Sequence, residues 1–66
     1  MKYELLEKVN QLLLTMNLRQ QAIGREILID TNFKIFEESS ILLLKDKKTG
    51  VVYKLQDYIK AKCNCG

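Results

Sequence analysis

The sequence predicts a small α+β domain with the order αβββα: an N-terminal amphipathic helix, a three-stranded antiparallel sheet and a short C-terminal helix. Three observations support this prediction. Apolar residues recur with a helical period at the start of the chain, β-branched and aromatic residues alternate in its middle, and a short lysine-rich segment with helical spacing closes it. We assign residues 1–62 to this single domain, because 66 residues leave no room for a second one. We expect residues 63–66 to form a flexible, cysteine-containing tail.

The first predicted element is an amphipathic helix from about Tyr3 to Asn17. Its apolar residues lie on a stripe about 120° wide, which suits a helix packed on a core. They are Leu5, Leu6, Val9, Leu12, Leu13 and Met16. The end of the helix is open at this point. Asn17 can end it, or the helix can extend, or a second short helix can follow through Ile23, with Gly24 as a natural terminator.

The next segments have the composition of β-strands. Residues 25–30 and 32–38 place β-branched and aromatic side chains in near alternation, with turn-prone residues between the two segments. They predict either two short strands or one strand with a bulge. The strongest hairpin signal follows, because two apolar runs flank "DKKTG", and Gly50 can adopt the positive φ that closes such a loop.

The last predicted element is a short helix that contains "QDYIKAK". Asp57 lies near its start and two lysines, Lys60 and Lys62, lie near its end, as the helix dipole favours. Leu55 and Ile59 share one face, which we expect to pack on the sheet.

Composition excludes several classes of protein. The chain is 47% hydrophobic and 29% charged, which is typical of a globular protein and not of a disordered one. No apolar run is long enough to span a membrane, and the first residues do not resemble a signal peptide. We therefore expect a cytoplasmic protein with no membrane partner. Lysine outnumbers arginine nine to two, which suggests an AT-rich genome, such as that of a low-GC bacterium or its phage.

Catalytic chemistry is not indicated. The chain has no histidine, and its three glycines are too far apart to form a phosphate-binding loop. A domain this small also has little room for a substrate pocket. We therefore expect no enzyme activity, no catalytic residues, no cofactor and no small-molecule substrate.

Cys63 and Cys65 are the only cysteines, and they have three interpretations: a metal or redox site, a disulfide bond, or free thiols in a frayed tail. A structural zinc site needs four ligands, and one Cys-x-Cys pair in a chain without histidine supplies two, so only a dimer could complete it. A bond between residues two apart would close a strained ring. We predict no metal site and a tail that is dispensable for folding.

A surplus of apolar residues predicts a protein partner. Leu14 and Leu18 lie off the main helical stripe, and residues 41–44 form an apolar run without alternation. Such a run needs cover on both faces, either from the two helices or from a second molecule. Because small domains often gain stability by association, we expect a homodimer or a standing protein partner that uses Leu14, Leu18, Ile41 and Leu43.

The alternative is nucleic-acid binding. Residues 45–66 carry six basic and two acidic groups, whereas residues 1–44 carry five and six. The lysines of the predicted hairpin, Lys45, Lys47, Lys48 and Lys54, are candidates for phosphate contacts. The alternative interpretation is that these charges belong to a soluble hairpin and prevent its edge from associating. The sequence thus predicts a small non-enzymatic interaction, regulatory or accessory protein, with nucleic-acid binding as the alternative.

Overall fold

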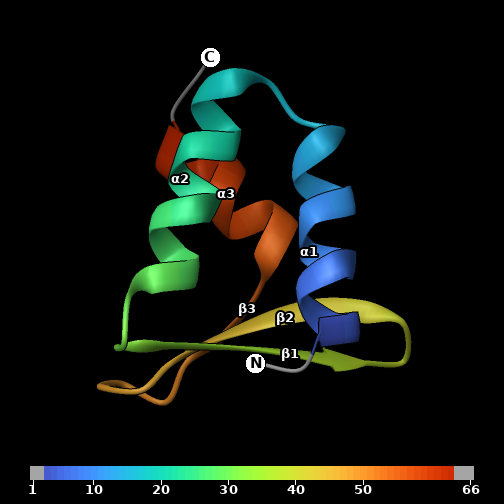
Figure 1. The fold of residues 1–66 in the computed structure, drawn as a ribbon. Coiled ribbons are helices and arrows are strands. Elements are labelled where there is room, and N and C mark those ends of the chain that lie inside the picture. The colour runs from blue at the N-terminus through green and yellow to red at the C-terminus, as the bar shows by residue number, and fades with distance from the viewer. Residues whose placement is uncertain (1–2, 64–66) are drawn as a thin grey trace.

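The computed structural model describes residues 3–63 (Figure 1). Within them the chain forms three helices and a three-stranded antiparallel sheet, so the predicted α+β class is confirmed. The elements in chain order are α1 (Tyr3–Leu14), α2 (Leu18–Ile29), β1 (Phe33–Glu38), β2 (Ile41–Asp46), β3 (Val52–Lys54) and α3 (Leu55–Cys63).

A second long helix, α2, is the main difference from the predicted order. It includes residues 25–29, which the alternation of isoleucines had indicated to be a strand. A capping box starts this helix: the backbone N–H of Gln20 donates to Asn17 Oδ1 at 2.9 Å, and the backbone N–H of Asn17 donates to Gln20 Oε1 at 3.2 Å. These two bonds satisfy backbone donors that a helix otherwise leaves unpaired, so they favour helix from Leu18 onward.

Gly24 lies inside α2 and does not end a helix. A Cβ atom at this position would clash with the Leu13 side chain and would lie 3.3 Å from Ile59 Cδ1. The missing side chain therefore allows α2 to approach both α1 and α3 closely.

Two turns fix the register of the sheet, whose strand order is β1-β2-β3. Ser39 and Ser40 join β1 to β2 with φ values of 52° and 64°, which are typical of a two-residue type I′ turn. Glu38 therefore faces Ile41, and the pairing continues to Phe33 opposite Asp46. The predicted hairpin between β2 and β3 is present, and Gly50 has a φ of 76°.

All three helices lie on the same face of the sheet (Figure 1). Residues from every helix and from β1 and β2 meet in one core: Val9, Leu13, Met16, Ile27, Ile35, Leu44, Leu55 and Ile59. Leu44 is fully buried, whereas Ile41, three residues earlier and on the opposite face, is 46% exposed. The described residues therefore cover only one face of the apolar run 41–44. The two predicted helices do not enclose this run between them.

No helix among residues 3–63 is both long and apolar enough to cross a membrane. Cys63 is the last residue of α3, so this helix extends one residue into the segment assigned to the tail. Residues 64–66, which include Cys65, lie outside the described residues.

Candidate interaction surfaces

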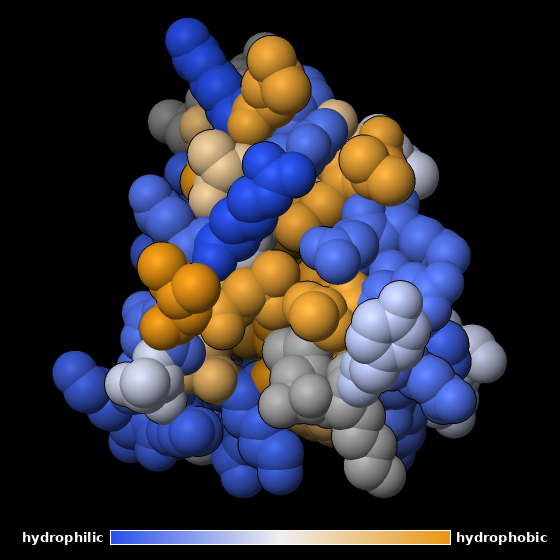
Figure 2. Space-filling view, viewed as in Figure 1, coloured by the Kyte–Doolittle hydropathy of each residue, from blue (hydrophilic) through white to orange (hydrophobic). Residues whose placement is uncertain are grey.

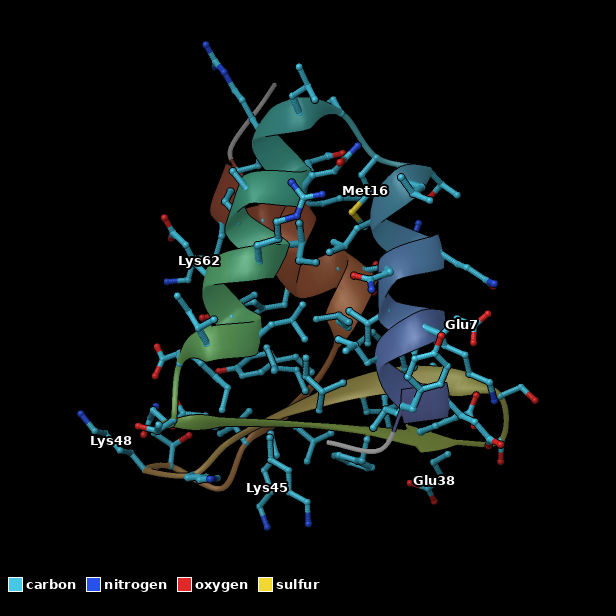
Figure 3. All side chains as sticks on the ribbon, viewed as in Figure 1. Glu7, Met16, Glu38, Lys45, Lys48 and Lys62 are labelled. Atoms are coloured by element: carbon cyan, nitrogen blue, oxygen red, sulfur yellow. The ribbon has the colours of Figure 1, made fainter. Side chains whose placement is uncertain are left out.

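The face of the sheet that points away from the helices is the first candidate surface. We call it the outer sheet face, and it comprises Lys34, Phe36, Glu38, Ile41, Leu43, Lys45, Val52 and Lys54. Side chains alternate along a strand, so residues opposite the buried Ile35 and Leu44 must point outward. Figure 3 shows Lys45 and Glu38 pointing away from the helices.

The outer sheet face has an apolar middle and charged ends. Phe36 lies opposite Leu43 in the centre. At one end Lys34 lies opposite Lys45, and like charges in that position destabilise a sheet. Three lysines and one glutamate give this face a net charge of +2. An apolar centre with a charged rim is the usual anatomy of a protein-binding surface.

The four residues predicted to form a protein interface do not lie together. Ile41 and Leu43 are on the outer sheet face. Leu14 and Leu18 flank the turn between α1 and α2, at the end of these helices away from the sheet (Figure 1), and are 72% and 82% exposed. One partner contact cannot include all four, because helices and sheet separate the two pairs.

The lysines predicted to contact nucleic acid also divide into two groups. Lys45 and Lys54 belong to the outer sheet face, whereas Lys47 and Lys48 follow β2 in the turn to β3. Lys34, which the sequence reasoning did not select, joins the first group because the register sets it opposite Lys45. Only the pairing of β1 with β2 could have revealed this neighbour.

Asp46 organises the turn that carries Lys47 and Lys48. Its Oδ1 accepts hydrogen bonds from the backbone N–H of Lys48 at 2.8 Å, from Asn32 Nδ2 at 3.1 Å and from the backbone N–H of Thr49 at 3.4 Å. The Lys48 bond contributes most to a pKa of Asp46 below its ordinary value, because each donor stabilises the charged form. The sequence reasoning missed this role, although an aspartate that opens a turn is a known signal for it.

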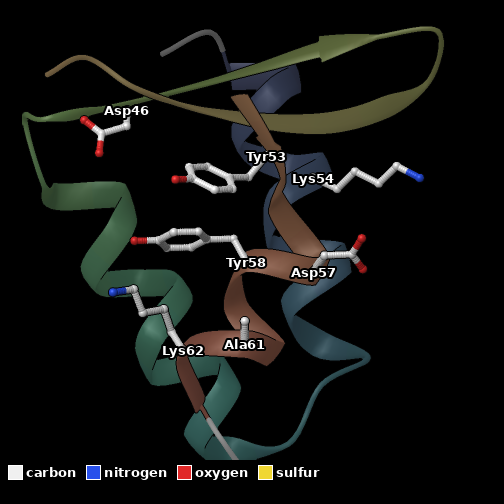
Figure 4. A pocket seen from close by; sticks show the side chains of 7 residues that line it. All are labelled: Asp46, Tyr53, Lys54, Asp57, Tyr58, Ala61 and Lys62. Atoms are coloured by element: carbon white, nitrogen blue, oxygen red, sulfur yellow. The ribbon is translucent and has the colours of Figure 1, made fainter. Parts of the chain in front are cut away.

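A cluster of aromatic rings joins α3 to the sheet (Figure 4). The ring centroid of Tyr58 lies 5.6 Å from that of Phe33 and 5.1 Å from that of Tyr53, and Lys62 Nζ lies 5.5 Å from the Tyr58 centroid. Tyr53 and Tyr58 border a cavity of about 720 Å³. Its charged residues are Asp46, Lys54, Asp57 and Lys62. The rings pack on one another and on the lysine, so we assign them a role in packing.

The second candidate surface is the edge of β1 that pairs with no other strand among residues 3–63, which we call the free edge. β1 is at the border of the sheet, and above it a cavity of about 520 Å³ opens between α1 and α2. We call this cavity the edge groove. Its apolar lining includes Leu5, Leu28, Ile29, Phe33 and Phe36. Figure 2 shows apolar side chains gathered in the hollow between the two helices.

One ion pair connects α1 to the end of β1 beside this groove. Lys8 Nζ donates to both carboxylate oxygens of Glu37 at 2.8 Å. This hydrogen bond raises the pKa of Lys8 above its ordinary value. The position of the pair shows that α1 lies over the end of β1.

No metal site is evident in the part of the chain that the structure describes: residues 3–63 contain no group of three or more potential ligands among His, Cys, Asp and Glu. Cys63 is disulfide-bonded. The interpretation of this residue as a free thiol is therefore wrong. Cys65 lies outside the described residues.

Comparison with known proteins adds no relative from which a function can be transferred. No protein-family model matches the chain, and no curated protein or solved structure matches it either.

Proposed function

We propose that this protein acts by binding and not by catalysis, and that it works as a homodimer in an interaction or accessory role. The observation that carries the proposal is the free edge of β1 with the apolar edge groove above it. An unpaired edge strand offers backbone donors and acceptors to another chain. An apolar groove beside it adds burial of side chains to that pairing.

An exposed apolar residue in the groove supports the same conclusion. Ile29 at the end of α2 lines the groove and is 82% exposed. Fully burying an isoleucine side chain stabilises a complex by about 1.5–3 kcal/mol. A domain of 66 residues buries a smaller share of its surface on folding than a larger domain does, so this contribution would be large for it.

The part of the outer sheet face on β2 and β3 would stay available in such a dimer, because the dimer uses the edge of β1. We assign to it the contact with a further partner, whose acidic groups would match the lysines at its rim. A cytoplasmic location is part of this proposal.

The first experiment is the mass in solution, measured by light scattering behind a sizing column over a range of protein concentrations. It is run at low and high salt, with and without reductant, because the chain contains cysteines. A reductant-resistant dimer at both salt concentrations supports the proposal. A monomer at every concentration overturns it.

Nucleic-acid binding is the second candidate, and the cluster of Lys34, Lys45 and Lys54 on one face favours it. The test is fluorescence anisotropy with labelled single-stranded DNA and RNA. Binding should weaken steeply as salt rises, and K45E/K54E should abolish it. The double variant K47E/K48E tests the turn separately. Unchanged binding by both double variants contradicts this candidate.

A further inference from the structure

We propose that two copies of this chain pair through antiparallel β1 strands, with Phe36 at the two-fold axis and Lys34 opposite Glu38 of the partner subunit. This inference rests on the proposed homodimer and specifies its geometry. The two sheets would then join into one continuous sheet, with all helices on the same side.

The first step concerns which backbone groups of β1 face the free edge. The backbone N–H of Lys47 donates to the carbonyl oxygen of Asn32 at 2.9 Å, which shows that the Asn32 carbonyl points toward β2. Along an antiparallel strand, the backbone N–H and C=O groups of successive residues point alternately to one side of the strand and to the other. The N–H and C=O groups of Lys34 and Phe36 therefore also point toward β2, and those of Ile35 and Glu37 point toward the free edge.

The second step concerns the registers that symmetry allows. A two-fold axis perpendicular to the sheet keeps the helices of both copies on one side. Residues that lie opposite each other in the two β1 strands must then be on the same face of the joined sheet. The backbone N–H and C=O groups of Ile35 and Glu37 must also meet hydrogen-bond partners on the second copy. Within β1, two registers satisfy these conditions, with Ile35 or Phe36 on the axis. A third register, with Glu37 on the axis, would leave Ile35 opposite the turn that follows the partner's β1.

The third step uses charge to choose among these registers. With Phe36 on the axis, Lys34 faces Glu38 of the partner subunit twice, in positions where opposed side chains come closest. With Ile35 on the axis, Lys34 faces the apolar Phe36 of the partner subunit. With Glu37 on the axis, two glutamates face each other, which is unfavourable. The Phe36 register alone creates two opposite-charge pairs.

The fourth step concerns the edge groove. α1 lies over the end of β1, as the Lys8–Glu37 ion pair shows, and α2 leads into its start. Antiparallel pairing therefore brings the end of α2 in one copy beside the start of α1 in the other. The exposed Ile29 would approach the groove side of α1, where Leu5 lies.

The area of the interface makes this helix contact necessary. A stable interface of standard size covers about 800 Å² on each partner, which is about one sixth of the 4855 Å² surface of this chain. A single short strand pair covers less than that. The groove must therefore close for the dimer to be stable.

The test exchanges the two charges at the predicted pair. K34E and E38K should each raise the dimer dissociation constant at least about tenfold, because each creates two like-charge contacts. An equimolar mixture of the two single variants should form heterodimers, since each charge then meets its opposite. The double variant K34E/E38K should regain wild-type dimerisation. K54E is the matched control, because Lys54 lies on the outer sheet face but not on β1, and it should leave the dimer unchanged.

Hydrogen exchange supplies a second measurement that needs no variant. The amides of Ile35 and Glu37 should exchange slowly above the dissociation constant and fast far below it. A dimer that K34E and E38K leave intact, or whose Ile35 amide stays unprotected, overturns this inference while the proposed homodimer stands. A wild-type chain that remains monomeric overturns both.

Discussion

Lys34 of β1 and Lys45 of β2 lie directly opposite each other on the face of the sheet that none of the described helices covers. Two positive charges in this position weaken the pairing of the strands. The arrangement therefore contributes to the potential of the surface and not to the stability of the fold. It leads to the first of five predictions.

Replacing Lys45 by glutamate should stabilise the monomer. The new pair with Lys34 has opposite charges, so we expect the free energy of unfolding to rise by about 0.5–1 kcal/mol at low salt. Urea denaturation at dilute concentration measures this change. The gain should shrink in high salt because surface charges are screened. A gain that does not depend on salt contradicts the electrostatic explanation.

Leu44 and Leu43 are neighbours in sequence but should differ strongly in their contribution to folding. Leu44 is fully buried, so Leu44→Ala should lower the free energy of unfolding by about 2–5 kcal/mol. Leu43 points to the outer sheet face, and Leu43→Ala should cost about 1 kcal/mol or less. Thermal and urea unfolding of the pair measure the difference. Equal losses would mean that both faces of β2 are covered.

The capping box at Asn17 should stabilise the start of α2. Asn17→Ala removes the acceptor for the Gln20 N–H and should cost about 1 kcal/mol. The variants Asn17→Asp and Asn17→Ser keep an acceptor and serve as controls. Faster hydrogen exchange at the start of α2, without a matching change in α3, would identify the helix concerned. An effect of the same size in the control variants would argue against capping.

Substitutions in the turn at Ser39 and Ser40 should increase the stability of the fold. Both serines have positive φ values, which cost free energy for residues other than glycine and asparagine. The double substitution S39N/S40G suits a type I′ turn and should raise the unfolding free energy by about 1 kcal/mol. Gly50→Ala is the converse control, since it forces a side chain onto a φ of 76°. It should lower stability, as measured by the same urea titration.

Asp46 should make stability fall at acid pH. Its pKa is below the ordinary value of 3.8 in the folded protein, chiefly because the Lys48 N–H binds the carboxylate. The folded state therefore binds this proton more weakly than the unfolded state does. The resulting stabilisation is complete above the ordinary pKa and is lost as pH falls through the lowered one.

The variant Asp46→Asn should remove this part of the acid dependence, which urea unfolding across the acid range can measure. Asn32→Ala removes one donor to Asp46 and should reduce the effect only in part. If the unfolding free energy falls identically at acid pH in wild type and Asp46→Asn, Asp46 is not the source of this loss.

Elements with a strong period were predictable from the sequence. The stripe of leucines predicted α1, and the apolar runs around "DKKTG" predicted β2 and β3. The second half of α2 was not predicted, because Ile27 and Ile29 two apart also fit a strand. A capping pair could have distinguished the helix from a strand: Asn17 is followed three residues later by Gln20.

The candidate surfaces were harder to predict than the elements. The charge of Lys45 and Lys54 made them candidates from the sequence alone. Lys34 is eleven positions from Lys45 in the chain, and the Ser39–Ser40 turn brings the two residues opposite each other. The edge groove is formed jointly by residues of α1, α2 and β1, which are far apart in the chain. Such spatial relations follow from packing and not from any local pattern.

Because all the described helices lie on one side of the sheet, the residues that form the core are separate from the residues of the outer sheet face. The eight side chains of the outer sheet face contribute little to the core, so their replacement should change recognition with little loss of stability. Selection can therefore alter the outer sheet face and the stability of the fold almost independently. Descendants of one ancestor could share the helix-side residues and still recognise different molecules.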